Sequence, residues 1–125
     1  MYYSENSNCI IDKSVQCVIA GCKTSEIPYG IKSIGESAFC GCTGLINITI
    51  PDSVTSIDNG AFRDCAGLTS ITIPDSVTSI GMYVFDGCSS LTELFVEEEN
   101  PIYHSAGNCI IQTDSKTLKA GCNTS

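Results

Sequence analysis

The sequence predicts a right-handed solenoid in which short units stack on one another, and two nested repeats carry this prediction. Pro28, Pro51 and Pro74 are spaced 23 residues apart, and the sequence around them recurs nearly unchanged as far as Val96. A longer repeat, offset by 100 residues, makes the two ends of the chain alike. A fixed period of about 20 to 50 residues is typical of folds built from stacked units.

The first part of each unit predicts a strand with one buried face. The pattern is Leu45-x-x-Ile48-x-Ile50, and it recurs 23 and 46 residues further along the chain. Its closing alternation of apolar and polar residues is typical of a half-buried strand. The proline after Ile50 cannot donate a ladder hydrogen bond and ends the strand. We therefore expect parallel strands near residues 46–50, 69–73 and 92–96.

The second part of each unit predicts a short extended piece followed by a turn of helix. Apolar residues stand three positions apart at Ile31 and Ile34, and an Ala38-Phe39 pair follows. The equivalent residues of the next two units are Val54, Ile57, Ala61 and Phe62, then Val77, Ile80, Val84 and Phe85. The helical turn is expected to end at Cys42, Cys65 and Cys88. The three phenylalanines recur beside a small residue and are expected to stack in the core.

A single unit is too small to fold alone, which is why stacking is expected. It carries roughly eight inward apolar side chains, each contributing about 1.5–3 kcal/mol when buried. Ordering one unit costs on the order of 35 kcal/mol in conformational entropy. Neighbouring units must therefore cover one another, as they do in a solenoid.

The end blocks are predicted to be β-hairpins, each with short apolar runs around a polar turn. A turn at residues 113–116 pairs Ile111 with Leu118 and Cys109 with Ala120. Strand alternation then places Ile110 and Lys119 on the face opposite Cys109, Ile111, Leu118, Ala120 and Cys122. In the first copy the inner face holds Cys9, Ile11, Val18, Ala20 and Cys22. The expected organisation is one domain over 1–125, with a hairpin unit at 1–25, three solenoid turns at 26–96, and a linker and hairpin unit at 97–125.

The full motif, Leu-x-x-Ile-x-Ile-Pro-x-x-Val-x-x-Ile-Gly-x-x-Ala-Phe-x-x-Cys-x-x-Leu, resembles the BspA-like class of leucine-rich repeats. The Asn-Cys-Ile-Ile and Ala-Gly-Cys-x-Thr-Ser blocks and the segment Asn100-Pro101-x-Tyr103-His104-Ser105 also resemble that family. Asp58, Val84 and Phe95 depart from the pattern, where the other units have glycine, alanine and threonine. The resemblance implies a leucine-rich repeat solenoid, a β-rich α/β right-handed superhelix. It also implies a surface-exposed or secreted protein of host-associated bacteria or protozoa, which serves adhesion and protein binding without catalysis.

Composition excludes several classes of partner. The chain has 125 residues and a net charge of −8, from 14 acidic and 6 basic residues. An acidic chain without clustered Lys and Arg is a poor match for a nucleic-acid backbone. No run of about 18 apolar residues is present, so we expect no membrane insertion. The first residues lack the pattern of a signal peptide, and the long repeat indicates a piece of a longer protein.

The nine cysteines are expected to be mainly buried thiols, and their odd number leaves at least one without an intramolecular partner. Cys42, Cys65 and Cys88 share one position and should form a buried column. A zinc site at Cys40-x-Cys42 would need a second ligand pair, which the neighbouring sequence does not supply. Disulfides between Cys9 and Cys22 or between Cys109 and Cys122 are disfavoured, because the hairpin register sets each pair diagonally. Cys17 and Cys40 are expected near the surface, and pairing between them or between chains stays open.

The remaining candidates for chemistry have simpler interpretations. His104 is the only histidine, and a turn residue is a better interpretation than a catalytic partner of a cysteine. Glu97, Glu98 and Glu99 could hold calcium weakly, but a solvated acidic turn is favoured. No phosphate-binding loop and no acid–base pair is present, so we expect no catalytic residue, no cofactor and no metal.

The candidate binding surface is the outward face of the predicted strands, which leucine-rich solenoids often use as a concave face. Its residues are Asn47, Thr49, Ser70, Thr72, Glu93 and Phe95. The preferred hypothesis is a protein-binding module of a surface adhesin, and the alternative is a spacer that extends a surface protein. Residues 47, 70 and 93 occupy one position of successive units and differ from one another. This variation favours the binding hypothesis. The hairpins at the ends should also allow weak self-association, because exposed strand edges invite pairing.

Overall fold

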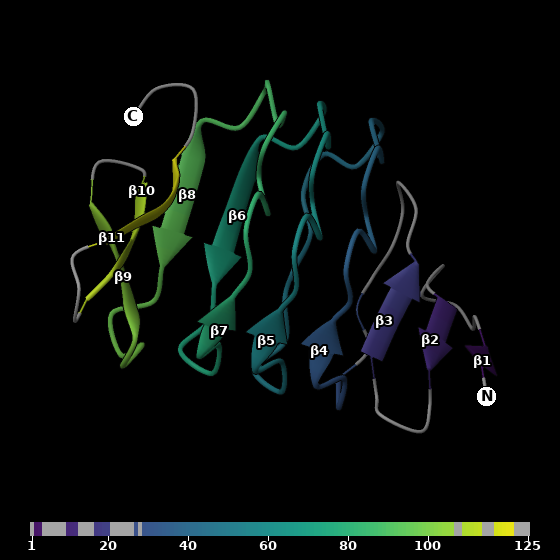
Figure 1. Ribbon diagram of the computed structural model, residues 1–125, viewed down its shortest axis with the longest axis horizontal. Helices are drawn as coiled ribbons and strands as arrows, with labels where there is room; N and C mark the ends of the chain where they lie inside the picture. The colour runs from purple at the N-terminus through teal and green to yellow at the C-terminus, as the bar shows by residue number, and fades with distance from the viewer. Residues whose placement is uncertain are drawn as a thin grey trace.

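All regular elements in the described part of the chain are β-strands. The computed structural model describes residues 2–3, 10–12, 17–20, 27, 29–106, 109–113 and 117–121. The strands, shown in Figure 1, are β1 (Tyr2–Tyr3), β2 (Ile10–Asp12), β3 (Cys17–Ala20), β4 (Ser33–Ile34), β5 (Ser56–Ile57), β6 (Ser70–Ile73), β7 (Ser79–Ile80), β8 (Glu93–Val96), β9 (Tyr103–Ala106), β10 (Cys109–Gln112) and β11 (Thr117–Gly121). The described residues contain no helix that could span a bilayer.

The predicted extended pieces are confirmed as a parallel ladder. Strands β4, β5 and β7 pair in steps of one unit, so that Ser33, Ser56 and Ser79 lie side by side. Strand β3 adds to β4 in parallel, while β2 and β1 continue the same sheet in antiparallel order. The block at the N-terminal end is therefore joined to the first unit through its backbone (Figure 1).

The second ladder contains two of the three strands predicted for the first part of the unit. β6 and β8 are parallel, with Ser70 opposite Glu93 and Thr72 opposite Phe95. The predicted strand at 46–50 is wrong as a full strand, because it is reduced to a parallel bridge between Asn47 and Ser70. The segment one unit earlier falls almost wholly outside the described residues. Backbone pairing of residues 46–50 is therefore described along one edge only, the edge next to β6.

The predicted turn of helix is wrong, since the described residues contain no helix. In the first unit, alternate backbone N–H groups donate to carbonyls of the next unit, at N···O distances of 3.0, 2.7 and 2.9 Å for Ser37, Phe39 and Gly41. The N–H groups between them close short turns within their own unit. In an α-helix the backbone N–H groups donate to carbonyls four residues earlier in the same segment. Here alternate N–H groups donate to the next unit, so a third ladder forms in place of a helix. Left-handed φ angles of 55° at Ser37 and 77° at Gly41 also interrupt a helix.

The phenylalanine stack is confirmed. Ring centroids are 5.1 Å apart between Phe39 and Phe62, and 5.7 Å apart between Phe62 and Phe85, with interplanar angles of 9° and 7°. Because all three ladders repeat the same backbone step, each ring is shifted onto the next with little rotation. The rings lie in a continuous core with the buried aliphatic side chains of the units.

The C-terminal block has three strands, because residues 103–106 of the predicted linker form β9 and pair with β10. Ile111 faces Leu118 as predicted, but Cys109 faces Gly121 and Ile110 faces Ala120. The register shifts between Ile110 and Ile111, where Lys119 of β11 has no partner residue on β10. The predicted faces are wrong for Ile110, which is fully buried, and for Ile111, which is half-buried. An equivalent irregularity lies between Ile10 and Ile11. The predicted inner faces of Cys9, Cys22 and Cys122 lie outside the described residues.

Asn100 and Tyr103 close the end of the stack. The Asn100 side-chain amide donates to the carbonyls of Pro74 and Val77, at 3.0 and 2.8 Å. Its oxygen accepts the N–H groups of Ile102 and Tyr103, both at 2.9 Å. The Tyr103 hydroxyl accepts the N–H of Ile80, at 2.9 Å, one unit away. These two side chains therefore form hydrogen bonds with backbone groups that would otherwise bond to a following unit.

Candidate functional site

The six predicted binding residues lie on one surface, which we call the strand face. Asn47 bridges to Ser70, Ser70 pairs with Glu93, and Thr72 pairs with Phe95. The inward residues between them, such as Ile71 and Leu94, are buried. Ser70 is half-buried, and the other five residues, Asn47, Thr49, Thr72, Glu93 and Phe95, are exposed. The alternation predicted from the sequence therefore places these side chains together.

A groove with a volume of about 420 Å³ runs over part of the strand face. Its lining includes Asn47, Thr49, Ser70 and Thr72, together with Asp52 and Glu97. Glu93 and Phe95 do not line it, although Phe95 stays 50% exposed beside Thr72. Sequence reasoning missed Asp52, because it follows the strand-ending proline and does not belong to the alternating pattern.

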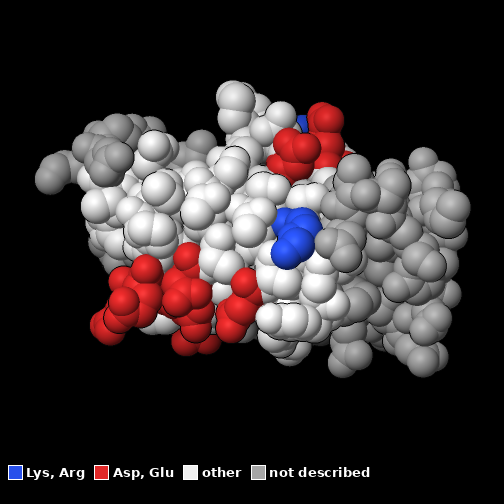
Figure 2. Space-filling view, turned by 90° about the horizontal axis from the view of Figure 1, so that it is seen from below, with Lys and Arg blue, Asp and Glu red and all other residues white. Residues whose placement is uncertain are grey.

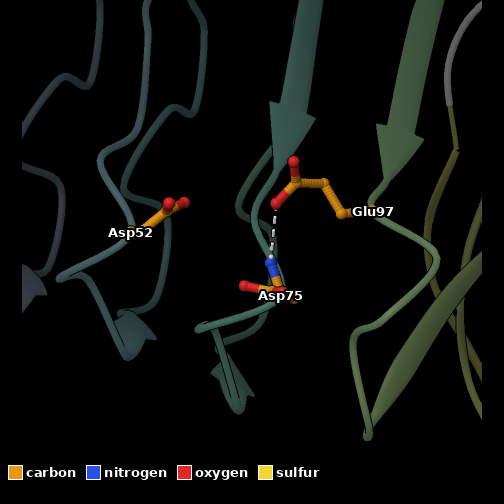
Figure 3. A group of neighbouring side chains, drawn as sticks. All are labelled: Asp52, Asp75 and Glu97. Carbon is orange, nitrogen blue, oxygen red and sulfur yellow. Dashed lines mark hydrogen bonds between the residues drawn. The ribbon is translucent and has the colours of Figure 1, made fainter.

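Three carboxylates meet at the end of the strand face. Asp52, Asp75 and Glu97 each place a carboxylate oxygen within 4.8 Å of the others (Figure 3). The backbone N–H of Asp75 donates to Glu97 Oε1 at 3.0 Å. Asp52 and Asp75 are one period apart, so stacking brings them together, and Glu97 follows the next strand. The sequence grouped Glu97 with Glu98 and Glu99 instead.

Acidic side chains gather along one edge of the molecule in Figure 2, with few basic side chains near them. Glu98 and Glu99 are exposed, and Glu97 is half-buried. Exposed carboxylates are common without a bound ion, and hydration satisfies such groups well. Asp52, Asp75 and Glu97 therefore form a charged surface at the groove.

The cysteine column is confirmed for two of its three members. Cys65 and Cys88 are buried, and their thiols donate to the carbonyls of Phe39 and Phe62, at 3.0 and 3.1 Å. Each thiol thus bonds to the preceding unit. Cys42 is half-buried, so its predicted burial is wrong; it belongs to the first unit, at the end of the column. Cys40 is exposed, as expected.

Two further predictions on cysteines cannot be compared with the described structure. The pairs Cys9–Cys22 and Cys109–Cys122 each include residues outside the described part of the chain. Cys17 lies on β3, opposite Ser33, and only its backbone is described.

The buried thiols should be chemically inert in the folded protein. Both side chains lie in the core, where a reagent cannot reach their sulfur atoms. The neighbouring Cys88 thiol and burial also raise the pKa of Cys65, and a protonated thiol is a poor nucleophile. We expect iodoacetamide at pH 8 to modify Cys40 in the native protein and to reach Cys65 and Cys88 only in denaturant. Peptide mapping by mass spectrometry measures the modified fraction at each residue. Modification of Cys65 as fast as Cys40 in native protein would contradict the buried column.

His104 lies on a strand, so its prediction as a turn residue is wrong. It belongs to β9, faces Ile111 in the pairing and is exposed. Its Nδ1 atom is 3.0 Å from Thr113 Oγ1, at the end of β10. The Thr113 N–H also donates to the Ile102 carbonyl at 2.8 Å. These contacts join β9 to β10, which is a structural role.

The recurrence seen in the ladders corresponds to a known family. A family model described as the BspA type leucine rich repeat region matches residues 10–124, in six copies. The chain belongs to the BspA-type leucine-rich repeat family. The match takes in the end blocks as well as the central units of this repeat protein. The resemblance seen in the motif is therefore confirmed.

Solved bacterial leucine-rich repeat proteins share this fold. A leucine-rich repeat protein from Eubacterium ventriosum is 28% identical, with a TM-score of 0.66 over 77% of this chain and 26% of its own. The pneumococcal vaccine antigen PcpA is 28% identical, with a TM-score of 0.66 over 78% of this chain and 23% of its own. A leucine rich cell surface protein from Faecalibacterium prausnitzii is 31% identical, with a TM-score of 0.65 over 77% of this chain and 26% of its own.

This BspA-type chain thus spans about a quarter of the length of each of these structures. A comparison with curated proteins found no match. Any function of this chain must therefore come from the shared repeat and from its own described surface.

Proposed function

We propose that this chain is a non-catalytic protein-binding module of a cell-surface or secreted, adhesin-like protein. The observation that carries the proposal is the groove, since four of the six residues of the strand face line it. Extracellular placement is supported by the similar proteins, one named as a vaccine antigen and one as a cell surface protein.

The chemistry of the groove suits a peptide or protein segment. The Asn47 amide and the Thr49, Ser70 and Thr72 hydroxyls can each donate and accept hydrogen bonds. Phe95 offers an exposed aromatic ring beside them, and aromatic residues are enriched at interface centres. A protein segment brings both main-chain polar groups and apolar side chains, so both parts of the surface would be used. A nucleic acid is a poor partner here, because the acidic residues Asp52 and Glu97 also line the groove.

The strand face can be tested with one substitution and a matched control. Thr72→Arg places a large cation in the groove, while Thr78→Arg places it at an exposed residue that does not line the groove. We expect Thr72→Arg to weaken binding by about tenfold or more, the effect of losing a well-packed contact, and Thr78→Arg to change it less than about twofold. The measurement is biolayer interferometry against a panel of purified mammalian extracellular proteins.

A spacer is the alternative function, and the same experiment separates the two. Three regular backbone ladders would extend a surface protein stiffly without any ligand, and Thr49 and Thr72 are identical at one outward position. If no protein of the panel binds, or if Thr72→Arg and Thr78→Arg weaken binding equally, the spacer is favoured. Whether the chain is a binding module or a spacer, we propose that it forms one domain. This domain is a right-handed superhelix with three central turns, and it holds no cofactor.

Self-association is proposed as a weak property of the end blocks. Strands β1 and β11 are the outer strands of their sheets in the described residues, and strand edges can pair with another chain. The net charge of −8 opposes association, so salt should strengthen it by screening the repulsion. Sedimentation velocity over a range of concentration and salt should show a mass that rises with both. A strict monomer at high concentration and high salt would contradict the proposal.

A further inference from the structure

A second surface of the molecule carries a tyrosine where the fold favours a small residue. The position that Ser37, Gly60 and Tyr83 share in successive turns has a left-handed backbone, with φ of 55°, 62° and 60°. A bulky residue rarely adopts this conformation, and the first two units show that serine or glycine suffices. Tyr83 is also 61% exposed, so packing of the core does not require its ring.

The backbone beneath Tyr83 is held in place. The N–H of Met82 donates to Asn59 Oδ1, at 2.8 Å, and the carbonyl of Met82 accepts the N–H of Gly60, also at 2.8 Å. Met82 is 57% exposed and precedes Tyr83. The turn therefore presents two neighbouring large side chains to solvent from a fixed backbone. Strained and exposed positions of this kind are found preferentially at functional sites.

A hollow with a volume of about 230 Å³ lies beside these side chains. Met82 and Tyr83 line it together with Glu36, Ser37, Asn59 and Arg63. Gly60, which has no side chain, also belongs to the lining and leaves room there. Because the volume is below the range of about 300–1,000 Å³ typical of small-molecule pockets, one protein side chain is a better fit than a complete small ligand.

The charges around the hollow favour a cation. Arg63 Nε is 3.8 Å from Asp86 Oδ2, so the single cation of the lining is paired with a carboxylate. Among the described residues, Glu36 has no ion pair. A guanidinium or ammonium group is attracted both to a carboxylate and to the face of an aromatic ring. The net charge of −8 would also speed the approach of a basic partner.

We propose that the hollow between Glu36 and Tyr83 is a second interaction site, which takes an Arg or Lys side chain of a partner protein. It shares no lining residue with the groove of the strand face. The proposal therefore stands whether or not that groove binds a ligand. Tyr83 supplies the ring, Glu36 the carboxylate, and Met82 an apolar edge.

The test is an NMR titration of the full chain with a blocked Gly-Arg-Gly peptide. The matched probe is Gly-citrulline-Gly, which has nearly the same shape without the charge. We expect amide shifts at Gly60, Arg63 and Tyr83 with the arginine peptide and no saturable shift with the citrulline peptide. Tyr83→Gly should weaken binding by about fivefold or more, the order of one cation–π contact, with an unchanged or higher melting temperature.

Two further variants distinguish a specific site from general charge attraction. Glu36→Gln removes the proposed carboxylate without changing its shape, and Glu98→Gln removes one exposed charge that does not line the hollow. Glu36→Gln should weaken binding by about fivefold, and Glu98→Gln by less than about twofold. Tyr83→Ser, which reproduces the first unit, replaces Tyr83→Gly if that variant does not fold. Equal binding of the citrulline peptide, equal effects of the two glutamate variants, or shifts confined to Asp52, Asp75 and Glu97 would each overturn the proposal.

Discussion

Replacing Phe62 with alanine should lower the free energy of unfolding by about 3–5 kcal/mol, as for other fully buried phenylalanines. The Phe62 ring is fully buried, with Phe39 at 5.1 Å on one side and Phe85 at 5.7 Å on the other. Its loss leaves a cavity that the neighbouring units cannot close, because their backbones are joined by ladders on both sides. Chemical denaturation followed by circular dichroism measures the change.

Phe95→Ala is the matched control for this prediction. Phe95 is 50% exposed and lies on the strand face, so its replacement should change stability by less than about 1 kcal/mol. A loss under about 1 kcal/mol for Phe62→Ala would mean that the stack does not support the core. If Phe95→Ala were as costly as Phe62→Ala, the assignment of inward and outward faces would be wrong.

Replacing Asn100 with alanine should cost about 3 kcal/mol, although Asn100 is a single polar residue. Its side chain makes four hydrogen bonds at 2.8–3.0 Å to backbone groups, and only 8% of Asn100 is exposed. Alanine would leave these donors and acceptors buried without partners, and each such group is costly. The variant should also lose structure first at the C-terminal end of the stack. Amide hydrogen exchange should therefore be faster at Val77 and Ile80 than in the wild-type protein.

Asn100→Asp separates the two halves of this contact. Aspartate keeps an oxygen for the N–H groups of Ile102 and Tyr103 but sets a carboxylate against the carbonyls of Pro74 and Val77. We expect it to be at least as destabilising as alanine near neutral pH, because like partial charges then face each other. Wild-type stability in both variants would show that Asn100 does not close the stack.

Much of the fold can be predicted from the repeat period. The spacing of Pro28, Pro51 and Pro74 is enough to place β4, β5 and β7 in register, to align β6 with β8, and to stack the phenylalanines. The outward set of the strand face follows from simple alternation, and the exposed residues agree with it. These features depend on equal steps along the chain, which can be counted in the sequence.

Other features depend on contacts between units. Spacing alone allowed a helical turn at Phe39, but its N–H donates to Ala61 of the next unit and a ladder forms instead. The register shift between Ile110 and Ile111 changes the partner of Cys109 from the predicted Ala120 to Gly121, since β11 has one extra residue at that point. Asp52, Asp75 and Glu97 meet because successive units bring together residues that lie far apart in the chain.

The sequence by itself determined the family, the unit length, the stacked core and the outward residues of the strand face, because each is a periodic property of the chain. Only the tertiary structure decided which backbone groups bond between units, how Asn100 and Tyr103 close the stack, and where the groove and the Tyr83 hollow lie. The physical reason is that a hydrogen bond or a cavity between units depends on the geometry of two segments at once. A periodic pattern specifies each segment but not the fit between them.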